Sequence, residues 1–122
     1  MAIDPTPSDI QRFVSADDGT PIVMLNLLRF ADGGADRYRE YALATQPFLA
    51  AVGGELLYAG LTGPALVADD GQSWDAVLLV RYPSRAAFFR MVSNPAYLAI
   101  THLRTSALRE AVLQPTSAWR LG

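Results

Sequence analysis

The sequence predicts an α+β domain with the ferredoxin-like element order β-α-β-β-α-β and an antiparallel sheet. Apolar runs at Ile22–Phe30 and 74–82 are typical of strands that are buried on both faces. Between the first two strands, residues 36–52 carry apolar side chains at helical spacing. Glycine-rich and proline-rich breaks separate these segments. We expect the first and third strands to lie side by side and to run parallel.

Each predicted element has its own start or stop signal. Thr6 is suited to cap a short first helix because Pro7 and Asp9 follow it in the first turn. Pro47 falls on the outer side of the 36–52 helix, where it leaves the apolar arc undisturbed. Gly53 and Gly54 end that helix. The remaining elements are expected to be strands Glu55–Leu61 and 74–82, helices 83–93 and 95–109, and an edge strand at 112–119 that contains Pro115.

Length and composition indicate a single domain over residues 1–122, with residues 1–20 as an N-terminal helical extension. Apolar residues make up 51% of the chain, charged residues 18%, and the net charge is −2. This balance predicts a folded protein that binds neither nucleic acid nor a membrane. No apolar stretch approaches the roughly 18–20 residues that span a bilayer. The first residues also lack a signal-peptide pattern, so we expect a cytoplasmic protein.

Missing residue types exclude several chemistries. The chain has no cysteine, which excludes disulfides, thiolate nucleophiles and iron–sulfur clusters. All ten basic residues are arginine, so no lysine is available to form a Schiff base. One histidine cannot build a multi-histidine metal site, and the acidic residues form no tight cluster. We therefore expect neither a metal nor a cofactor.

Both faces of the first and third strands are apolar, which predicts self-association. The crossover helices of this plan cover only one face of the sheet. The other face would expose a large apolar patch to water unless a second copy covered it. We therefore expect a homodimer in which two sheets pack together around a two-fold axis and close a barrel.

Five motifs, in order along the chain, carry a resemblance to a known family. They are MLNLLRF at 24–30, YREY at 38–41, VGG at 52–54, RYPS at 81–84 and NPAYLAITHLRTSAL at 94–108. Together they resemble small bacterial proteins classed as a domain of unknown function within the dimeric α/β-barrel superfamily. The resemblance implies a ferredoxin-like protomer and a homodimer. It implies no activity, because the superfamily includes cofactor-free quinol monooxygenases, haem-dependent chlorite dismutases, muconolactone isomerases and stress-responsive barrel proteins.

Three polar residues on predicted core faces are candidates for ligand contact. Asn26 lies among leucines, so its amide either bridges backbone groups of the sheet or binds a carbonyl or phenol ligand. Tyr38 and Tyr41 share the inner arc of the 36–52 helix. Such a pair is either core packing with tethered hydroxyls or part of a pocket. We treat Asn26 and Tyr38 as candidate catalytic residues and Tyr41 as a candidate ligand contact.

Arginine and tryptophan near the strand ends form a second group of candidates. If the first and third strands are parallel, Arg29 and Arg81 end on equivalent faces and together bind an anionic head group. Alternatively they pair with carboxylates at the dimer rim, with Asp75 and Glu55 as the nearest choices. Trp74 starts the third strand and either walls the pocket or packs at its rim.

Arg104 and His102 lie on opposite sides of the last predicted helix. Arg104 falls inside the apolar arc, where a charge needs either an ion-pair partner or an anionic ligand. His102 is the only histidine and therefore the only ready general base near neutral pH. It falls on the polar side of the helix, so it is either a solvated residue or a third candidate catalytic group.

Two functions and one structural alternative follow from these candidates. The first is a cofactor-independent, monooxygenase-like or isomerase-like enzyme acting on a small enolic, phenolic or quinol-like molecule, with an arginine stabilising negative charge. The second is a non-catalytic homodimer, ligand-binding or stress-associated, that holds a small acid. In the third, every polar residue named above only supports packing.

Overall fold

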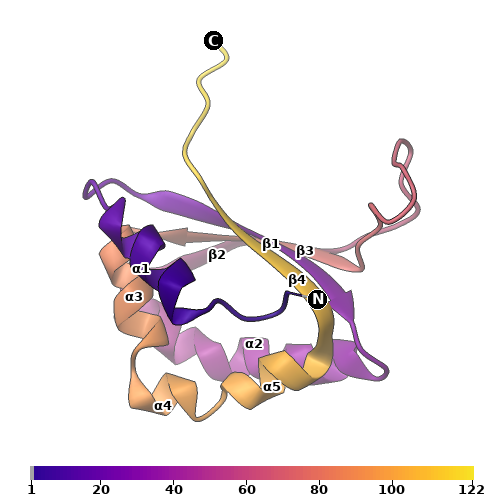
Figure 1. Cartoon of the computed structure of the whole chain (residues 1–122), viewed down its shortest axis with the longest axis horizontal. Helices are drawn as coiled ribbons and strands as arrows, with labels where there is room; N and C mark the ends of the chain where they lie inside the picture. The colour runs from indigo at the N-terminus through magenta and orange to yellow at the C-terminus, as the bar shows by residue number, and fades with distance from the viewer. Residues whose placement is uncertain (1) are drawn as a thin grey trace.

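The computed structural model describes residues 2–122 and contains a four-stranded sheet with helices on one face (Figure 1). The strand order is β2-β3-β1-β4, with every neighbouring pair antiparallel. This is the ferredoxin-like α+β fold that the sequence predicts. The elements are α1 (Pro7–Ser15), β1 (Ile22–Phe30), α2 (Gly34–Ala51), β2 (Glu55–Leu61), β3 (Ala76–Tyr82), α3 (Arg85–Val92), α4 (Pro95–Leu98), α5 (Thr101–Ala107) and β4 (Leu108–Thr116).

Local signals place the helix starts as predicted. Thr6 caps α1 through a capping box, in which its hydroxyl accepts from the Asp9 N–H and the Asp9 carboxylate accepts from the Thr6 N–H. The Ser84 hydroxyl caps α3 by accepting from the Ala87 N–H, and the Asn94 amide oxygen caps α4 by accepting from the Ala96 N–H. Pro47 lies on the exposed side of α2, and the helix continues through it.

The orientation of β1 relative to β3 corrects one prediction. The two strands are neighbours, as expected, but they are antiparallel, with Ile22 opposite Tyr82 and Leu28 opposite Ala76. The reason is the crossover. Helix α2 returns the chain to form β2 parallel to β1, and β3 then inserts between them antiparallel to both.

Several element boundaries also differ from the prediction, and helix α2 begins at Gly34 rather than at residue 36. Strand β3 begins at Ala76 rather than at residue 74. The long C-terminal helix ends early, because Leu108 is already extended and pairs with Phe30 of β1. Strand β4 therefore spans Leu108–Thr116 instead of 112–119, and the helical part divides into α4 and α5. Strand β4 is an edge strand, as Pro115 indicated.

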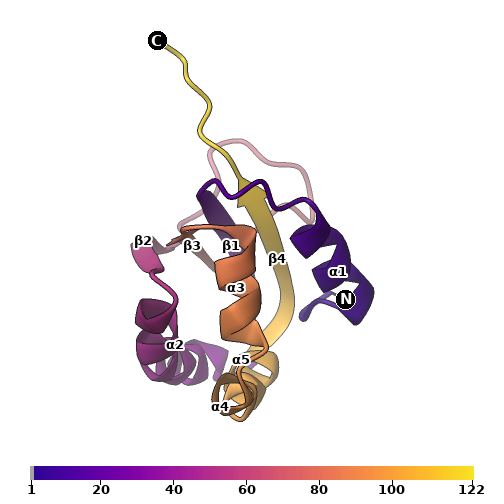
Figure 2. The ribbon, with the colours of Figure 1, turned by 90° about the vertical axis from the view of Figure 1, so that its left-hand side faces the viewer.

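Alternate residues of β1 explain where the core lies. Ile22, Met24, Asn26 and Leu28 are buried beneath the helices. The intervening side chains point to the opposite face, where they are only half-buried. Within residues 2–122 no helix covers that face, as Figures 1 and 2 show. The loop of residues 62–75 and the C-terminal segment of residues 117–122 project on this open side.

A close approach between α2 and α5 requires glycine. A Cβ built on Gly34 would lie 2.0 Å from the carbonyl oxygen of Ala107. The Ala31 N–H donates to the same oxygen at 2.8 Å. The end of α5 is thus fixed against the start of α2, and this contact positions the residues of α5 that face the sheet.

Candidate functional site

A cavity of about 420 Å³ lies between the helix-covered side of the sheet and helices α3, α4 and α5. This volume falls in the range typical of small-molecule sites. Three residues that the sequence singled out line it: Asn26 from β1, Tyr41 from α2 and Arg104 from α5. Asp4 and Pro5, which precede α1, line it as well. The cavity therefore brings together residues more than 60 positions apart in the chain, such as Asn26 of β1 and Arg104 of α5.

Arg104 is the most unusual group in this cavity, because only 6% of the residue is exposed. Its Nη1 donates to the Ile3 carbonyl oxygen at 2.7 Å and to Asp4 Oδ1 at 2.8 Å. Its Nη2 is buried and has no hydrogen-bond partner among the described residues. A buried cationic donor without a partner is costly, so its retention needs an explanation.

A group of tyrosines surrounds the guanidinium. The hydroxyls of Tyr41 and Tyr97 lie 2.6 Å apart, and the rings of Tyr38 and Tyr41 are 5.4 Å apart. Burial raises the pKa of Tyr38, and the neighbouring Tyr41 adds to the rise, while the Arg104 guanidinium partly opposes it. Burial also raises the pKa of Tyr82 and Tyr97. These phenols are therefore protonated near neutral pH and act as hydrogen-bond donors rather than bases.

Asn26 has a local tether. Only 7% of the residue is exposed, and its Nδ2 donates to the Met24 carbonyl oxygen at 3.2 Å. This contact is of the backbone-bridging kind that the sequence analysis gave as one alternative. Asn26 nevertheless lines the cavity from the side of the sheet, whereas Arg104 lines it from α5.

Arg29 and Arg81 do not form the pair that the sequence analysis considered. Because β1 and β3 are antiparallel, Arg81 lies opposite Val23 and Glu55, whereas Arg29 lies opposite Glu110 at the other end of the sheet. Neither arginine lines the cavity.

Arg29 is instead a support for the 62–75 loop. Its Nε donates to Glu110 at 2.5 Å, and its Nη2 donates to the Gly71 carbonyl oxygen at 2.6 Å. Nη1 contacts Ser73. The guanidinium also stacks on the ring of Trp74, 4.3 Å from its centroid. The carboxylate partner is Glu110 rather than Asp75 or Glu55, and Trp74 lies at the sheet's rim rather than in the cavity wall.

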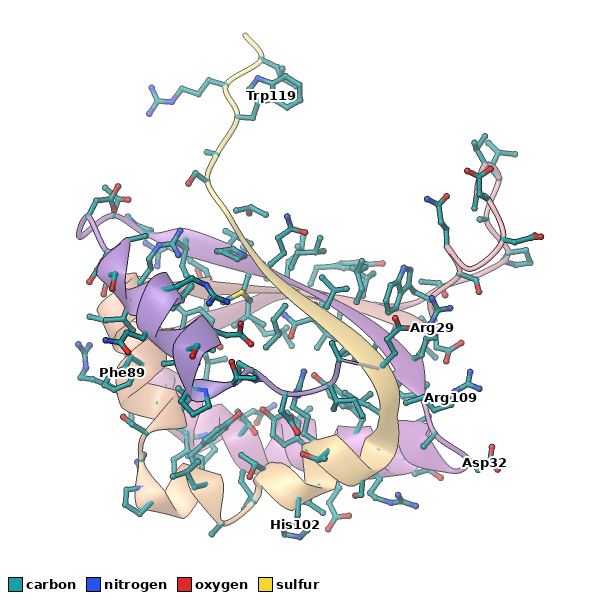
Figure 3. The ribbon with its side chains drawn as sticks, in the orientation of Figure 1. Arg29, Asp32, Phe89, His102, Arg109 and Trp119 are labelled. Carbon is teal, nitrogen blue, oxygen red and sulfur yellow. The ribbon has the colours of Figure 1, made fainter. Side chains whose placement is uncertain are left out.

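His102 lies on the outside of α5, where Figure 3 shows it pointing away from the sheet. Its Nδ1 is 3.1 Å from the Ala99 carbonyl oxygen. It does not reach the cavity, in agreement with its place on the polar side of the helical wheel. Among residues 2–122, no group of three or more histidine, aspartate or glutamate side chains is placed to hold a metal ion. The same residues contain no helix both long and apolar enough to cross a membrane.

The cavity residues that the sequence analysis missed include Asp4, Tyr97 and Thr105. Tyr97 had a signal, since it shares the apolar arc of its helix with Arg104. Asp4 and Thr105 had none, because their contact joins positions about a hundred residues apart.

The sheet order, the single layer of helices and the cavity between them define a ferredoxin-like α+β protein. The family model described as a domain of unknown function (DUF1330) matches residues 28–114, and the chain belongs to this family. The resemblance drawn from the sequence motifs is confirmed at that level.

Solved structures of other proteins have a similar fold. The RPA0582 protein of Rhodopseudomonas palustris, whose function is unknown, is 29% identical with a TM-score of 0.87, and the match covers 97% of each chain. A dimeric ferredoxin-like protein of unknown function from Jannaschia is 13% identical with a TM-score of 0.62, covering 80% of this chain and 99% of that one.

A hydroxynitrile lyase from Passiflora edulis is 12% identical with a TM-score of 0.62, covering 80% of this chain and 93% of that one. The similarities to the Jannaschia protein and to the hydroxynitrile lyase concern the fold alone. No curated protein matches the chain.

Proposed function

We propose that the protein binds a small anionic or phenolic molecule in the cavity beside Arg104 and acts on it as a cofactor-independent enzyme. The observation that carries the proposal is the buried Nη2 of Arg104, which lacks a partner within residues 2–122. A guanidinium in an apolar, tyrosine-lined cavity favours negative charge on an oxygen atom much more strongly than one in water does.

The available groups fit a substrate that supplies its own acidic proton. The tyrosine hydroxyls and the Asn26 amide form hydrogen bonds, and Arg104 stabilises the enolate or phenolate that remains when the substrate releases its proton to water. Such chemistry is isomerase-like or, with molecular oxygen as co-substrate, monooxygenase-like. The hydroxynitrile lyase of Passiflora edulis supports the idea that a chain of this fold serves as an enzyme.

A non-catalytic binding role is the second candidate, and one observation favours it. The only histidine is outside the cavity, and the buried tyrosines have raised pKa values. Residues 2–122 therefore offer this cavity no imidazole to take a proton from a bound molecule at neutral pH. Tight binding without turnover is the result that this candidate predicts.

The experiment is a calorimetric and spectroscopic screen of small carboxylic acids, phenols and enolisable ketones against the full chain. Binding that is lost in Arg104→Met but retained in Arg109→Met supports the proposal, because Arg109 is exposed and points away from the cavity (Figure 3). Turnover of a bound compound supports the enzyme, and binding without turnover supports the second candidate. Equal binding by both variants contradicts both.

The proposal also includes a homodimer, built through the open face of the sheet. The face consists of half-buried apolar residues such as Leu25 on β1 and Leu79 on β3, which lie opposite one another. Continuous apolar surface of this kind is typical of association sites. The dimeric proteins of similar fold support the same arrangement. The cysteine-free sequence is compatible with the reducing bacterial cytoplasm, where we place the protein.

Light scattering after gel filtration tests the dimer. Leu25→Asp places a charge in the open face and is expected to give a monomer. Leu43→Asp is the matched control, because Leu43 lies on the outer side of α2 and is 57% exposed. A wild-type protein that is monomeric at micromolar concentration would contradict the dimer.

A further inference from the structure

We propose that residues 2–5, here called the strap, form a displaceable lid over the cavity, and that the ligand is a carboxylate that replaces Asp4 on Arg104. This inference rests on the proposed function and names both the ligand class and the way the site is closed. In the structure, Asp4 of the strap occupies the position beside Arg104 that the ligand carboxylate would take.

Asp4 shows which chemistry the site accepts. Its Oδ1 receives a hydrogen bond from Arg104 Nη1 at 2.8 Å, and its Oδ2 receives one from the Thr105 hydroxyl at 2.9 Å. The two oxygens of one carboxylate are thus held by two donors on successive residues of α5. Carboxylates and guanidinium groups form strong charge-assisted hydrogen bonds with this geometry. A ligand carboxylate would meet the same two donors.

The unpartnered donor explains why the strap must move. Nη2 of Arg104 is buried and has no partner among residues 2–122, whereas Ile3 and Asp4 both bind Nη1. Opening the strap would expose Nη2 together with Nη1. A ligand carboxylate can then bind both nitrogens, which Asp4 does not. The ligand therefore satisfies a donor that the strap leaves without a partner among residues 2–122.

A small set of contacts holds the strap: the Ala111 N–H donates to the Ala2 carbonyl oxygen at 2.8 Å, Ile3 packs against the core, and Arg104 and Thr105 bind Ile3 and Asp4. The Asp4 side chain is 46% exposed, although its partner is almost fully buried. Helix α1, which follows the strap, contains no buried residue. Asp4 and Pro5 line the cavity that holds Arg104, and they also line a second cavity of about 590 Å³ on the side of α1 and β4. The strap thus has open space beside it.

The rest of the cavity wall indicates which chemical group the ligand carries beside its carboxylate. Beyond the carboxylate-binding end, the wall includes Met24, Tyr41, Met91 and Leu113, which offer apolar and aromatic surface. A carboxylate attached to a ring or a short apolar chain fits this wall better than a sugar acid or a phosphate ester does. We therefore expect a small aromatic or apolar monocarboxylate.

Isothermal titration of the full chain with benzoate, and with benzamide as its neutral counterpart, tests the inference. Asp4→Ala removes the internal competitor, so benzoate should bind about fivefold more tightly while benzamide is unaffected, given the usual strength of partly exposed ion pairs. Asp70→Ala, at an exposed aspartate in the 62–75 loop, is the matched control and should change neither affinity.

Hydrogen exchange provides a second readout that does not depend on a variant. Benzoate should accelerate amide exchange in residues 2–14 of the wild-type protein and leave β1 unchanged. If benzoate binds through Arg104 but Asp4→Ala weakens its affinity, or if exchange in residues 2–14 slows, the lid is refuted and the proposed function stands. If benzoate binds neither the wild type nor Asp4→Ala, the carboxylate inference fails, and the screen of phenols and enolisable ketones tests the proposed function separately.

Discussion

Replacing Arg104 by methionine tests whether this arginine binds a ligand or stabilises the fold. The substitution removes the hydrogen bonds to the Ile3 carbonyl oxygen and to Asp4, and such bonds to a charged group contribute about 1.5–3 kcal/mol each. It also removes the buried Nη2, whose lack of a partner within residues 2–122 costs a similar amount, about 1–3 kcal/mol. The two effects oppose one another, so they cancel in part.

The cost of Arg104→Met also depends on whether the Asp4 carboxylate that remains is buried. Breaking a buried ion pair usually costs 3–5 kcal/mol because the remaining charge stays buried. Here the remaining carboxylate is 46% exposed and can turn into water. We therefore expect Arg104→Met to change the free energy of unfolding by less than about 3 kcal/mol, and the Tm by no more than about 12 °C.

Urea unfolding followed by tryptophan fluorescence measures this difference, with Arg109→Met as the control that should match the wild type. Benzoate affinity, measured on the same preparations, should fall at least about tenfold in Arg104→Met alone. A destabilisation above about 3 kcal/mol would refute the reasoning, because it would show that Arg104 holds the fold together. Unchanged benzoate affinity in Arg104→Met would also refute the reasoning, because it would show that Arg104 does not bind the carboxylate.

Three further predictions concern the fold around the cavity. Gly34→Ala should cost about 2 kcal/mol or more in urea unfolding, because the new Cβ meets the Ala107 carbonyl oxygen, whereas Gly63→Ala should be neutral. Tyr41→Phe should cost about 1–2 kcal/mol by leaving the Tyr97 hydroxyl without its partner, and a neutral result would mean that water replaces the bond. The free energy of unfolding should be constant from neutral pH to about pH 10 and fall above it. The unfolded tyrosines ionise near 10.0, whereas the buried ones hold their protons to higher pH, and a flat profile from pH 10 to 11 would contradict this.

The alternation of side chains along β1 was enough to predict which residues face the helices. Asn26 and Leu28 were placed on one face and Leu25 and Leu27 on the other, as the structure has them. Period-two patterning carries this information because one strand's faces do not depend on its partners. The direction of the neighbouring strand is not encoded in the same way. It depends on where the crossover returns the chain, and the parallel arrangement of β1 and β3 was wrong for that reason.

The same distinction applies to the cavity. The burial of Arg104 was predicted correctly, because its position on the helical wheel is a local property of α5. Its partner Asp4 was not predicted, because the contact depends on how the strap crosses the end of the sheet. The pairing of Arg29 with Arg81 failed together with the strand direction on which it depended. The helix end at Ala107 was missed because the apolar run after it suits a strand as well as a helix.

The central claim is that the cavity beside Arg104 is a carboxylate site. A crystal structure of the protein with 4-bromobenzoate tests it most directly, because bromine can be located by its anomalous scattering. We predict a bromine peak inside the cavity, the carboxylate bound to Nη1 and Nη2 of Arg104, and Asp4 displaced from the guanidinium. A ligand bound elsewhere, with Asp4 still paired to Arg104, would contradict the claim.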